Sequence, residues 1–459
     1  MRHCCLCGLL CSLDRVASST CPRRTQWIER SAANLAANPA ANIRSATTTP
    51  LRARIDTIAD QFRASRRPLM WIDSADVHTL RCAVALAEAV RGTIHIGQST
   101  GAIASHRVLT SQGWLGSSLA EVASHADLII SLGSGLHTEA PLLAPRFFAP
   151  ALIGDRAQWW HIASRDSASP ASPWRDLSSH ASTCTDHRPL SPNWTAVWPR
   201  ADWYAQLTHI MLGLQDDSAR ADAVAGQLHE STRQLLDRLR SAKNTVWLWD
   251  VDEFRDAIDE LCIQRLLGIS RLLSQTARCG LIGLDAQVGR VTALETLLWL
   301  TGCSGTAQFD GQHWSQPHGL AELAMEQWPT VFDAIMVVRS LPSVYPLPSL
   351  PAGQFLVPQQ SLLPDHIGPE KVTAVASVGV DCDGHVMRGD RATLLYCLAD
   401  VAEVADVAGG AGGAVADRAD RADRADALPG TATAELPTAG EVLQHIHRRV
   451  LAGGQIDAH

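Results

Sequence analysis

The sequence is poor in lysine and has no surplus of positive charge. Only Lys243 and Lys371 are lysines among its 39 basic residues, and the formal net charge is −8. We attribute the preference for arginine to codon usage. Because a protein that binds nucleic acid needs a dense basic face for the phosphates, this composition argues against a nucleic-acid partner.

The sequence also lacks a long apolar run. No stretch approaches the roughly 20 apolar residues that are needed to span a bilayer. The apolar N-terminus up to Leu13 is similar to a short signal peptide, but Asp14 and Arg15 interrupt it and no typical cleavage site follows. Leu10 precedes Cys11, where a lipoprotein signal has a small residue. We therefore expect a cytoplasmic protein without a membrane partner.

Cysteine is abundant, but its distribution is not that of a secreted disulfide protein. Five of the 12 cysteines lie within the first 21 residues of a 459-residue chain, a clustering typical of metal ligands in a reducing compartment. Cys4, Cys7 and Cys11, with Cys21 nine residues further on, supply the four thiolates that a [4Fe–4S] cluster requires. Zinc fits the same ligands, and a vestigial head that binds nothing is the third alternative. Cys5 is surplus to the set of four ligands.

The alternation of short apolar runs and amphipathic stretches predicts an α/β protein. Helices are expected at 52–65, 76–90, 117–124, 217–241, 254–275, 287–300 and 441–451. Strands are expected at 68–72, 93–97, 127–132, 245–250, 280–284, 333–338 and 354–357. This order predicts right-handed βαβ units and a parallel sheet.

Changes in composition divide the chain into six predicted parts. They are a Cys-rich head and tether (1–50), a first α/β domain (51–165), an irregular connection (166–215), a second α/β domain with a β-rich return (216–400), a low-complexity linker (401–436) and a C-terminal helix (437–459).

Two further patterns bear on binding. Gly133, Ser134 and Gly135 follow the strand 127–132, at the position where α/β folds bind phosphates on a helix N-terminus. The third glycine of a dinucleotide fingerprint is missing, so the pattern is only a weak signal for a nucleotide pocket. The acidic run from Asp250 to Glu260 lacks the pattern of a calcium loop, and we interpret it as acidic residues that enter a helix N-terminus.

Several segments together resemble the B subunit of formylmethanofuran dehydrogenase. They are the cysteine head, the segment 113–130 with a Leu-Ala-Glu-Val and an Ala-Asp-Leu, the Trp-Leu-Thr-Gly at 299–302, and the glycine-containing segment 379–390. The segments occur in the same order as in that family. The resemblance implies the α/β fold of molybdopterin oxidoreductases such as formate dehydrogenase, with parallel-sheet, Rossmann-like layers and without the C-terminal barrel.

In the redox-active members of that family, tungsten or molybdenum sits on two pterin dithiolenes and takes a further ligand from a cysteine or selenocysteine. Counting back from Glu121 places this ligand at about Gly101, and no cysteine occurs between Cys82 and Cys184. Glycine has no side chain to bind a metal. The resemblance therefore implies that the metal ligand is lost and that molybdopterin and tungsten are absent. In the family the turn that corresponds to Gly133, Ser134 and Gly135 lies near the pterin, so the resemblance implies a vestigial pterin or nucleotide pocket there.

These departures are similar to those of bacterial formyltransferase/hydrolase complexes, which serve the tetrahydromethanopterin-linked conversion of formaldehyde to formate. The resemblance implies a redox-inactive, structural B subunit whose partners are an amidohydrolase-like subunit, a formyltransferase subunit and a C-type subunit. Two alternatives remain open. One is a redox-active molybdo- or tungstopterin formylmethanofuran dehydrogenase subunit, and the other is a stand-alone nucleotide-binding α/β protein.

Overall fold

The structure is a computed structural model of the chain. It describes residues 4–11, 21–27, 29, 50–97, 100–133, 135–149, 153–164, 192–215, 230–254, 257–317, 327–343, 347, 350, 353–358, 361, 367–399 and 436–454. Within these ranges, no helix has the length and apolarity needed to cross a membrane.

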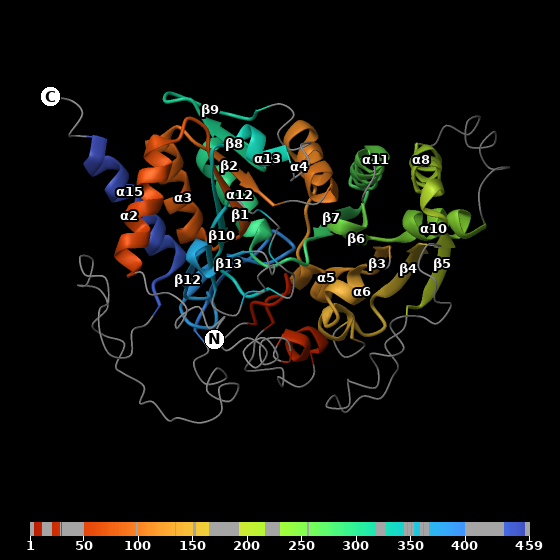
Figure 1. The fold of residues 1–459 in the computed structure, drawn as a ribbon. Helices are drawn as coiled ribbons and strands as arrows, with labels where there is room; N and C mark the ends of the chain where they lie inside the picture. Colours follow the sequence, from red (N-terminus) through yellow and green to blue (C-terminus); the bar gives the residue numbers. More distant parts are fainter. Residues whose placement is uncertain are drawn as a thin grey trace.

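Two sheets, both mainly parallel, lie side by side and confirm the α/β class (Figure 1). The seven-stranded sheet has the order β12 (Val372–Val375), β11 (Gln354–Pro358), β10 (Ala334–Arg339), β1 (Pro68–Ser74), β2 (Thr93–Ile96), β8 (Thr306–Phe309), β9 (Trp314–Ser315). The five-stranded sheet has the order β5 (Trp194–Trp198), β4 (Gln158–Ser164), β3 (Leu128–Leu132), β6 (Asn244–Asp250), β7 (Arg278–Leu284). Within these two sheets as described, the antiparallel pairings are those of β2 with β8 and of β8 with β9.

The chain passes from one sheet to the other and back. β1 and β2 begin the seven-stranded sheet, β3 to β7 form the five-stranded sheet, and β8 to β12 complete the first one. The predicted ranges 51–165 and 216–400 therefore do not coincide with the sheets, because each range contributes strands to both. Which strands share a sheet depends on long-range pairing, which local composition does not encode.

The predicted irregular connection 166–215 contains regular structure, which corrects that part of the prediction. It includes β5 and the helix α8 (Trp203–Leu214). β5 is an edge strand with alternating exposed and buried residues, and α8 buries Trp203, Leu207 and Ile210. The proline and serine residues nearby hid both patterns. Four predicted segments lie outside the described residues. They are residues 166–191 of the connection, 401–435 of the low-complexity linker, 30–49 of the tether and 217–229 of the predicted helix 217–241.

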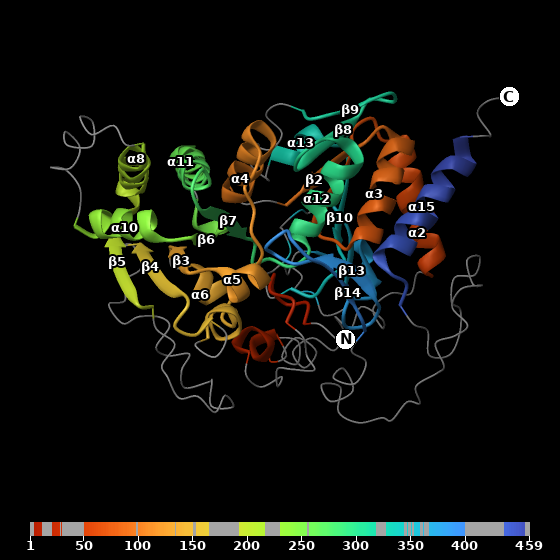
Figure 2. The ribbon, with the colours of Figure 1, turned by 180° about the vertical axis from the view of Figure 1, so that it is seen from behind.

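Helices cover both sheets and enclose separate apolar cores (Figure 2). On the seven-stranded sheet they are α2 (Leu51–Ala64), α3 (Val77–Val90), α12 (Arg290–Thr301) and α15 (Ala439–Gly454). One face of the five-stranded sheet carries α4 (Thr100–Gln112), α8, α10 (Glu230–Ser241) and α11 (Ala257–Leu273). The other face carries α5 (Leu119–His125), α6 (Gly135–Glu139), the π-helix η3 (Ala144–Phe148) and the cysteine head. The predicted C-terminal helix is confirmed as α15, which packs on α2 and α3.

A carboxylate fixes the start of the central strand pair. Asp333 lies just before β10 and accepts hydrogen bonds from the Ser65 hydroxyl and from the amides of Arg66 and Arg67, which precede β1. Burial opposes ionisation of Asp333, but these hydrogen bonds outweigh it and lower the pKa of Asp333 to about 2. The contact holds β1 and β10 in their parallel register.

This contact makes an acid-dependent contribution to stability. A carboxylate whose pKa is lowered on folding stabilises the protein above its unfolded pKa, and the effect is lost as the pH falls through the folded pKa. We expect Asp333→Asn to cost about 1 kcal/mol at pH 7, because solvent screens an exposed carboxylate, and to cost little near pH 2. Urea unfolding between pH 2 and 7 measures this dependence. Asp237→Asn, in an exposed pair with Arg240, is the control, and an equal pH dependence of both variants would contradict the assignment.

Candidate functional site

The cysteine head folds into a closed, buried loop. The amide of Cys4 donates to the carbonyl of Cys11 at 2.7 Å, and the amide of Leu10 donates to the carbonyl of Cys7 at 3.2 Å. All four predicted ligands, Cys4, Cys7, Cys11 and Cys21, are buried and free of disulfides. The structure therefore brings the predicted ligand set into one buried region.

The thiols of the head influence one another's ionisation. Burial raises the pKa of Cys4 to about 12, and the neighbouring Cys11 and Cys21 add to this rise. Burial also raises the pKa of Cys7, again with contributions from Cys11 and Cys4. These mutual effects mean that the four thiols lie within electrostatic reach of one another, and without a metal Cys4, Cys7 and Cys11 are protonated at neutral pH.

Two arginines bring positive charge to the same thiols. Arg24 lowers the pKa of Cys4, in opposition to burial, and is itself only 6% exposed. Arg146 does the same for Cys11, partly through a hydrogen bond. The Nη1 of Arg146 is buried and has no hydrogen-bond partner. A cluster held by four thiolates is an anion that this guanidinium would help to stabilise, so the residues fit a [4Fe–4S] cluster.

A single metal ion fits the described residues less well. Among them, no three His, Cys, Asp or Glu side chains are grouped so that they could hold one ion. Zinc needs four donors around one point, whereas each cysteine of an iron–sulfur cluster binds a different iron. The [4Fe–4S] cluster, the zinc ion and the vestigial head all stay predictions for the cysteine head.

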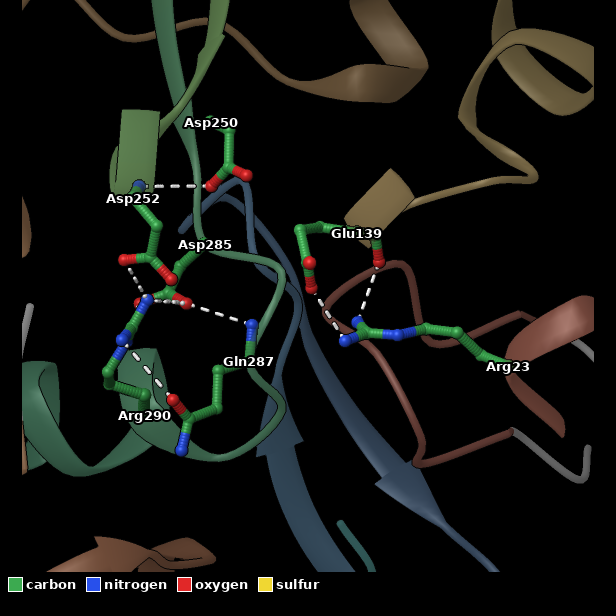
Figure 3. Close-up of polar contacts among 7 residues, drawn as sticks. All are labelled: Arg23, Glu139, Asp250, Asp252, Asp285, Gln287 and Arg290. Carbon is green, nitrogen blue, oxygen red and sulfur yellow. Dashed lines mark hydrogen bonds and ion pairs between the residues drawn. The ribbon is translucent and has the colours of Figure 1, made fainter. Parts of the chain in front are cut away.

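The head is anchored to the five-stranded sheet by an ion pair (Figure 3). Arg23, in the helical residues 22–27, donates from Nη2 to the Glu139 carboxylate at 2.6 Å and from Nη1 to the Glu139 carbonyl at 2.7 Å. The side chain of Arg23 is 7% exposed. Such a charge-assisted, two-point contact fixes the helix next to Cys21 against α6.

A buried network of charges lies where β6 and β7 end (Figure 3). Arg290 Nε lies 2.6 Å from Asp285 Oδ2, and Arg290 Nη2 lies 2.8 Å from Asp285 Oδ1 and 2.8 Å from Asp252 Oδ1. Asp285 also accepts from the amide of Gln287, and Asp250 accepts from the amide of Asp252. Burial, followed by the nearby Asp252, raises the pKa of Asp250 well above its usual value.

The acidic run 250–260 enters helix N-termini, as predicted, but two of its carboxylates are buried in polar contacts. Asp250 and Asp259 are both 2% exposed, and Asp259 forms an ion pair with Arg200 at 2.5 Å. The sequence analysis did not single out Asp285 and Arg290. The available signal was a charged residue directly after the apolar strand 278–284, because parallel strands of a sheet gather such residues at one edge.

The glycine-rich turn after β3 receives carboxylates of its own chain. The amide of Gly135 donates to Glu253 Oε2 at 2.9 Å. A Cβ atom at Gly133 would lie 2.6 Å from Glu253 Cδ, and one at Gly135 would lie 2.6 Å from Asp250 Oδ2. Ser134 lies outside the described residues. The vestigial pterin or nucleotide pocket at Gly133, Ser134 and Gly135 stays a prediction, and a ligand there would compete with Glu253.

Gly101, the predicted position of the lost metal ligand, is packed against backbone. It is buried near the start of α4, where a Cβ atom would lie 1.8 Å from the carbonyl oxygen of Val251 and 2.4 Å from that of Phe254. Both carbonyls belong to the short turn that follows β6. Because no side chain fits here, a cysteine at Gly101 would have no space for its sulfur.

Comparison with known proteins gives one structural likeness to report. No protein-family model matches the chain, and no curated protein matches it in sequence. A chain in the crystal structure of the formyltransferase/hydrolase complex (FhcABCD) from Methylorubrum extorquens, in complex with methylofuran, is similar in structure. The TM-score is 0.65 at 20% sequence identity, over 89% of this chain and 98% of that chain. The two chains share a fold. Likeness to molybdopterin oxidoreductases more widely stays a prediction.

The contact at Gly101 predicts a large effect for a small substitution. We expect Gly101→Ala to destabilise the protein by about 3 kcal/mol, because the new methyl group would overlap a backbone oxygen that cannot rotate away. Gly116→Ala is the matched control, because a Cβ atom there meets only Trp114 at 3.4 Å. Urea unfolding compares the two variants. Equal stability would mean that the Val251 carbonyl moves aside easily.

The cysteine head predicts iron binding by the full-length chain. Anaerobic incubation with ferrous iron and sulfide should yield four irons and four sulfides per chain, because four buried thiols and two arginines suit the cluster. Chemical iron and sulfide analysis, with electron paramagnetic resonance after reduction, measures the product. Cys7→Ser should abolish it and Cys5→Ser should retain it. A chain that binds no iron would leave the vestigial head as the correct alternative.

Proposed function

We propose that this chain is the B-type subunit of a formyltransferase/hydrolase complex in one-carbon metabolism, and that it is structural and redox-inactive. Its partners in this proposal are an amidohydrolase-like subunit, a formyltransferase subunit and a C-type subunit. The complex would move a formyl group to a furan-type cofactor and hydrolyse it to formate.

The packing of Gly101 carries the redox-inactive part of the proposal. A metal-binding side chain at this position would collide with the carbonyl oxygens of Val251 and Phe254. The next residue, Ala102, is buried and offers no donor atom. The position that the family resemblance assigns to the tungsten or molybdenum ligand therefore supports a subunit without that ligand.

The shared fold supports the choice of complex. The similarity to a chain of the Methylorubrum extorquens assembly extends over 98% of that chain, so the likeness is not limited to a common sheet motif. The motifs at 113–130, 299–302 and 379–390 occur in the order that the B-subunit family requires. Together these observations favour a B-type subunit over a stand-alone nucleotide-binding protein. A nucleotide phosphate at this turn would need the amide of Gly135, which donates to Glu253 instead.

One observation favours the alternative of a redox-active dehydrogenase subunit. The buried thiols of the cysteine head, with Arg24 and Arg146 beside them, fit an iron–sulfur cluster, and such a cluster commonly passes electrons. A cluster retained without a redox partner would have only a structural role. The activity of the complex separates the two functions.

The proposal predicts hydrolysis that needs no electron acceptor. A tag on this chain would allow purification of the complex with its partner subunits. We expect the complex to release formate from formylmethanofuran in buffer alone, at a rate that an added viologen dye does not change. Formate production measured with and without the dye gives the result. Turnover that requires the dye would establish the dehydrogenase alternative instead.

A further inference from the structure

Arg391 is a buried arginine whose hydrogen-bonding groups are unused. It lies in the loop between β13 (Gly384–Met387) and β14 (Leu394–Cys397), and its side chain is 14% exposed. The Nε, Nη1 and Nη2 atoms are all buried, and none has a hydrogen-bond partner. The neighbouring charge is Glu295 of α12, whose Oε1 lies 3.6 Å from Nη1.

Glu295 and His106 bring two more unused atoms to the same place. Glu295 Oε1 has no hydrogen-bond partner and lies 3.9 Å from Nε2 of His106, which also has none. His106 belongs to α4, and its side chain is 2% exposed. Its other nitrogen, Nδ1, lies 2.7 Å from the hydroxyl of Ser304, which orients the ring. Five unpartnered polar atoms from three elements thus lie next to one another.

Arg391 is the positively charged member of this group. Burial raises the pKa of Glu295, partly offset by Arg391, and burial lowers the pKa of His106 well below its usual value. His106 is therefore driven toward its neutral form, whereas an arginine in a protein keeps its charge. The carboxylates of Glu295 and Asp285 lie near this guanidinium, but buried donors that make no hydrogen bond are costly unless a ligand satisfies them.

The donors and acceptors narrow the chemistry of that ligand. A guanidinium presents a planar fork that binds two oxygens of a carboxylate or phosphate side by side. Glu295 Oε1 needs a neighbour that either donates a proton to it or accepts one from it. Hydrogen phosphate meets both demands, since it offers several acceptor oxygens and one O–H group. Sulfate and formate offer acceptor oxygens alone at neutral pH.

We propose that Arg391, Glu295 and His106 form a buried binding site for a small oxyanion of the hydrogen-phosphate class, free or as a phosphate monoester. The guanidinium of Arg391 donates hydrogen bonds to two oxygens of the anion, and Glu295 shares a proton with a third oxygen. His106 lines the remaining side of the site. The site is distinct from the cysteine head and from the turn at Gly135, and it does not depend on the proposed function.

Calorimetric titration of inorganic phosphate into the full-length chain, with its co-purifying partners and at constant ionic strength, tests the proposal. We expect saturable binding at pH 7.5, and at least about tenfold weaker binding of sulfate and formate, because an ionised Glu295 would be left without a proton donor. Arg391→Gln should weaken phosphate binding by about tenfold or more. The control Arg449→Gln, in an exposed pair with Asp56, should leave it unchanged.

Glu295→Gln is nearly isosteric and tests the shared proton separately. Its amide can donate to any oxyanion, so we expect the preference for phosphate over sulfate to disappear while sulfate binding improves. Three results would overturn the proposal. They are no saturable phosphate binding by the native chain, equal affinity for phosphate, sulfate and formate, and an unchanged affinity in a folded Arg391→Gln variant. Whether glycerol phosphate competes with inorganic phosphate then distinguishes the monoester from the free ion.

Discussion

A contact among three backbone segments holds the centre of this protein together. Gly8 of the cysteine head, Asp285 at the end of β7 and Gly389 after β13 pass so closely that no side chain fits between them. The amide of Gly8 donates to the carbonyl of Ala286, the amide of Gly389 to that of Gly8, and the amide of Asp285 to that of Gly389. A Cβ atom at Gly8 would lie 1.9 Å from the oxygen of Asp285, and one at Gly389 would lie 2.2 Å from the same atom. This contact links the head, the five-stranded sheet and the β13–β14 hairpin.

The polar sites are arranged around that contact. The backbone of Asp285 takes part in this three-segment contact, and its side chain binds Arg290. The position of the head and that of the charge network after β7 therefore depend on each other. The loop that begins at Gly389 carries Arg391 and thereby sets where its guanidinium lies. A buried ion pair stabilises a fold only when its hydrogen bonds are complete. The pair of Arg290 and Asp285 meets this condition and is a structural element. The pair of Arg391 and Glu295 lacks such hydrogen bonds, which is the basis of the proposed anion site.

The sequence predicted local structure well and long-range arrangement poorly. Apolar runs identified β1, β3, β6, β7 and β10, because buried parallel strands consist of such runs. The sequence analysis missed α4, because the apolar residues of this helix have little helical periodicity. The helix is held instead by its contact with the turn after β6. The cysteine head and Gly101 could be singled out because spacing and family resemblance are properties of the sequence. The reason that Gly101 admits no side chain could not be predicted from the local sequence, because the contacting residue Val251 lies 150 residues away. Nor does any local pattern reveal that Arg391, Glu295 and His106 meet.

The account of this chain as a redox-inactive subunit depends on the backbone that fills the space beside Gly101. The metal content of the complex isolated from its native source tests that claim most directly, by elemental analysis for tungsten and molybdenum per chain. The account predicts amounts far below one atom per chain, even when both metals are supplied during growth. One tungsten or molybdenum atom per chain, retained through purification, would contradict it.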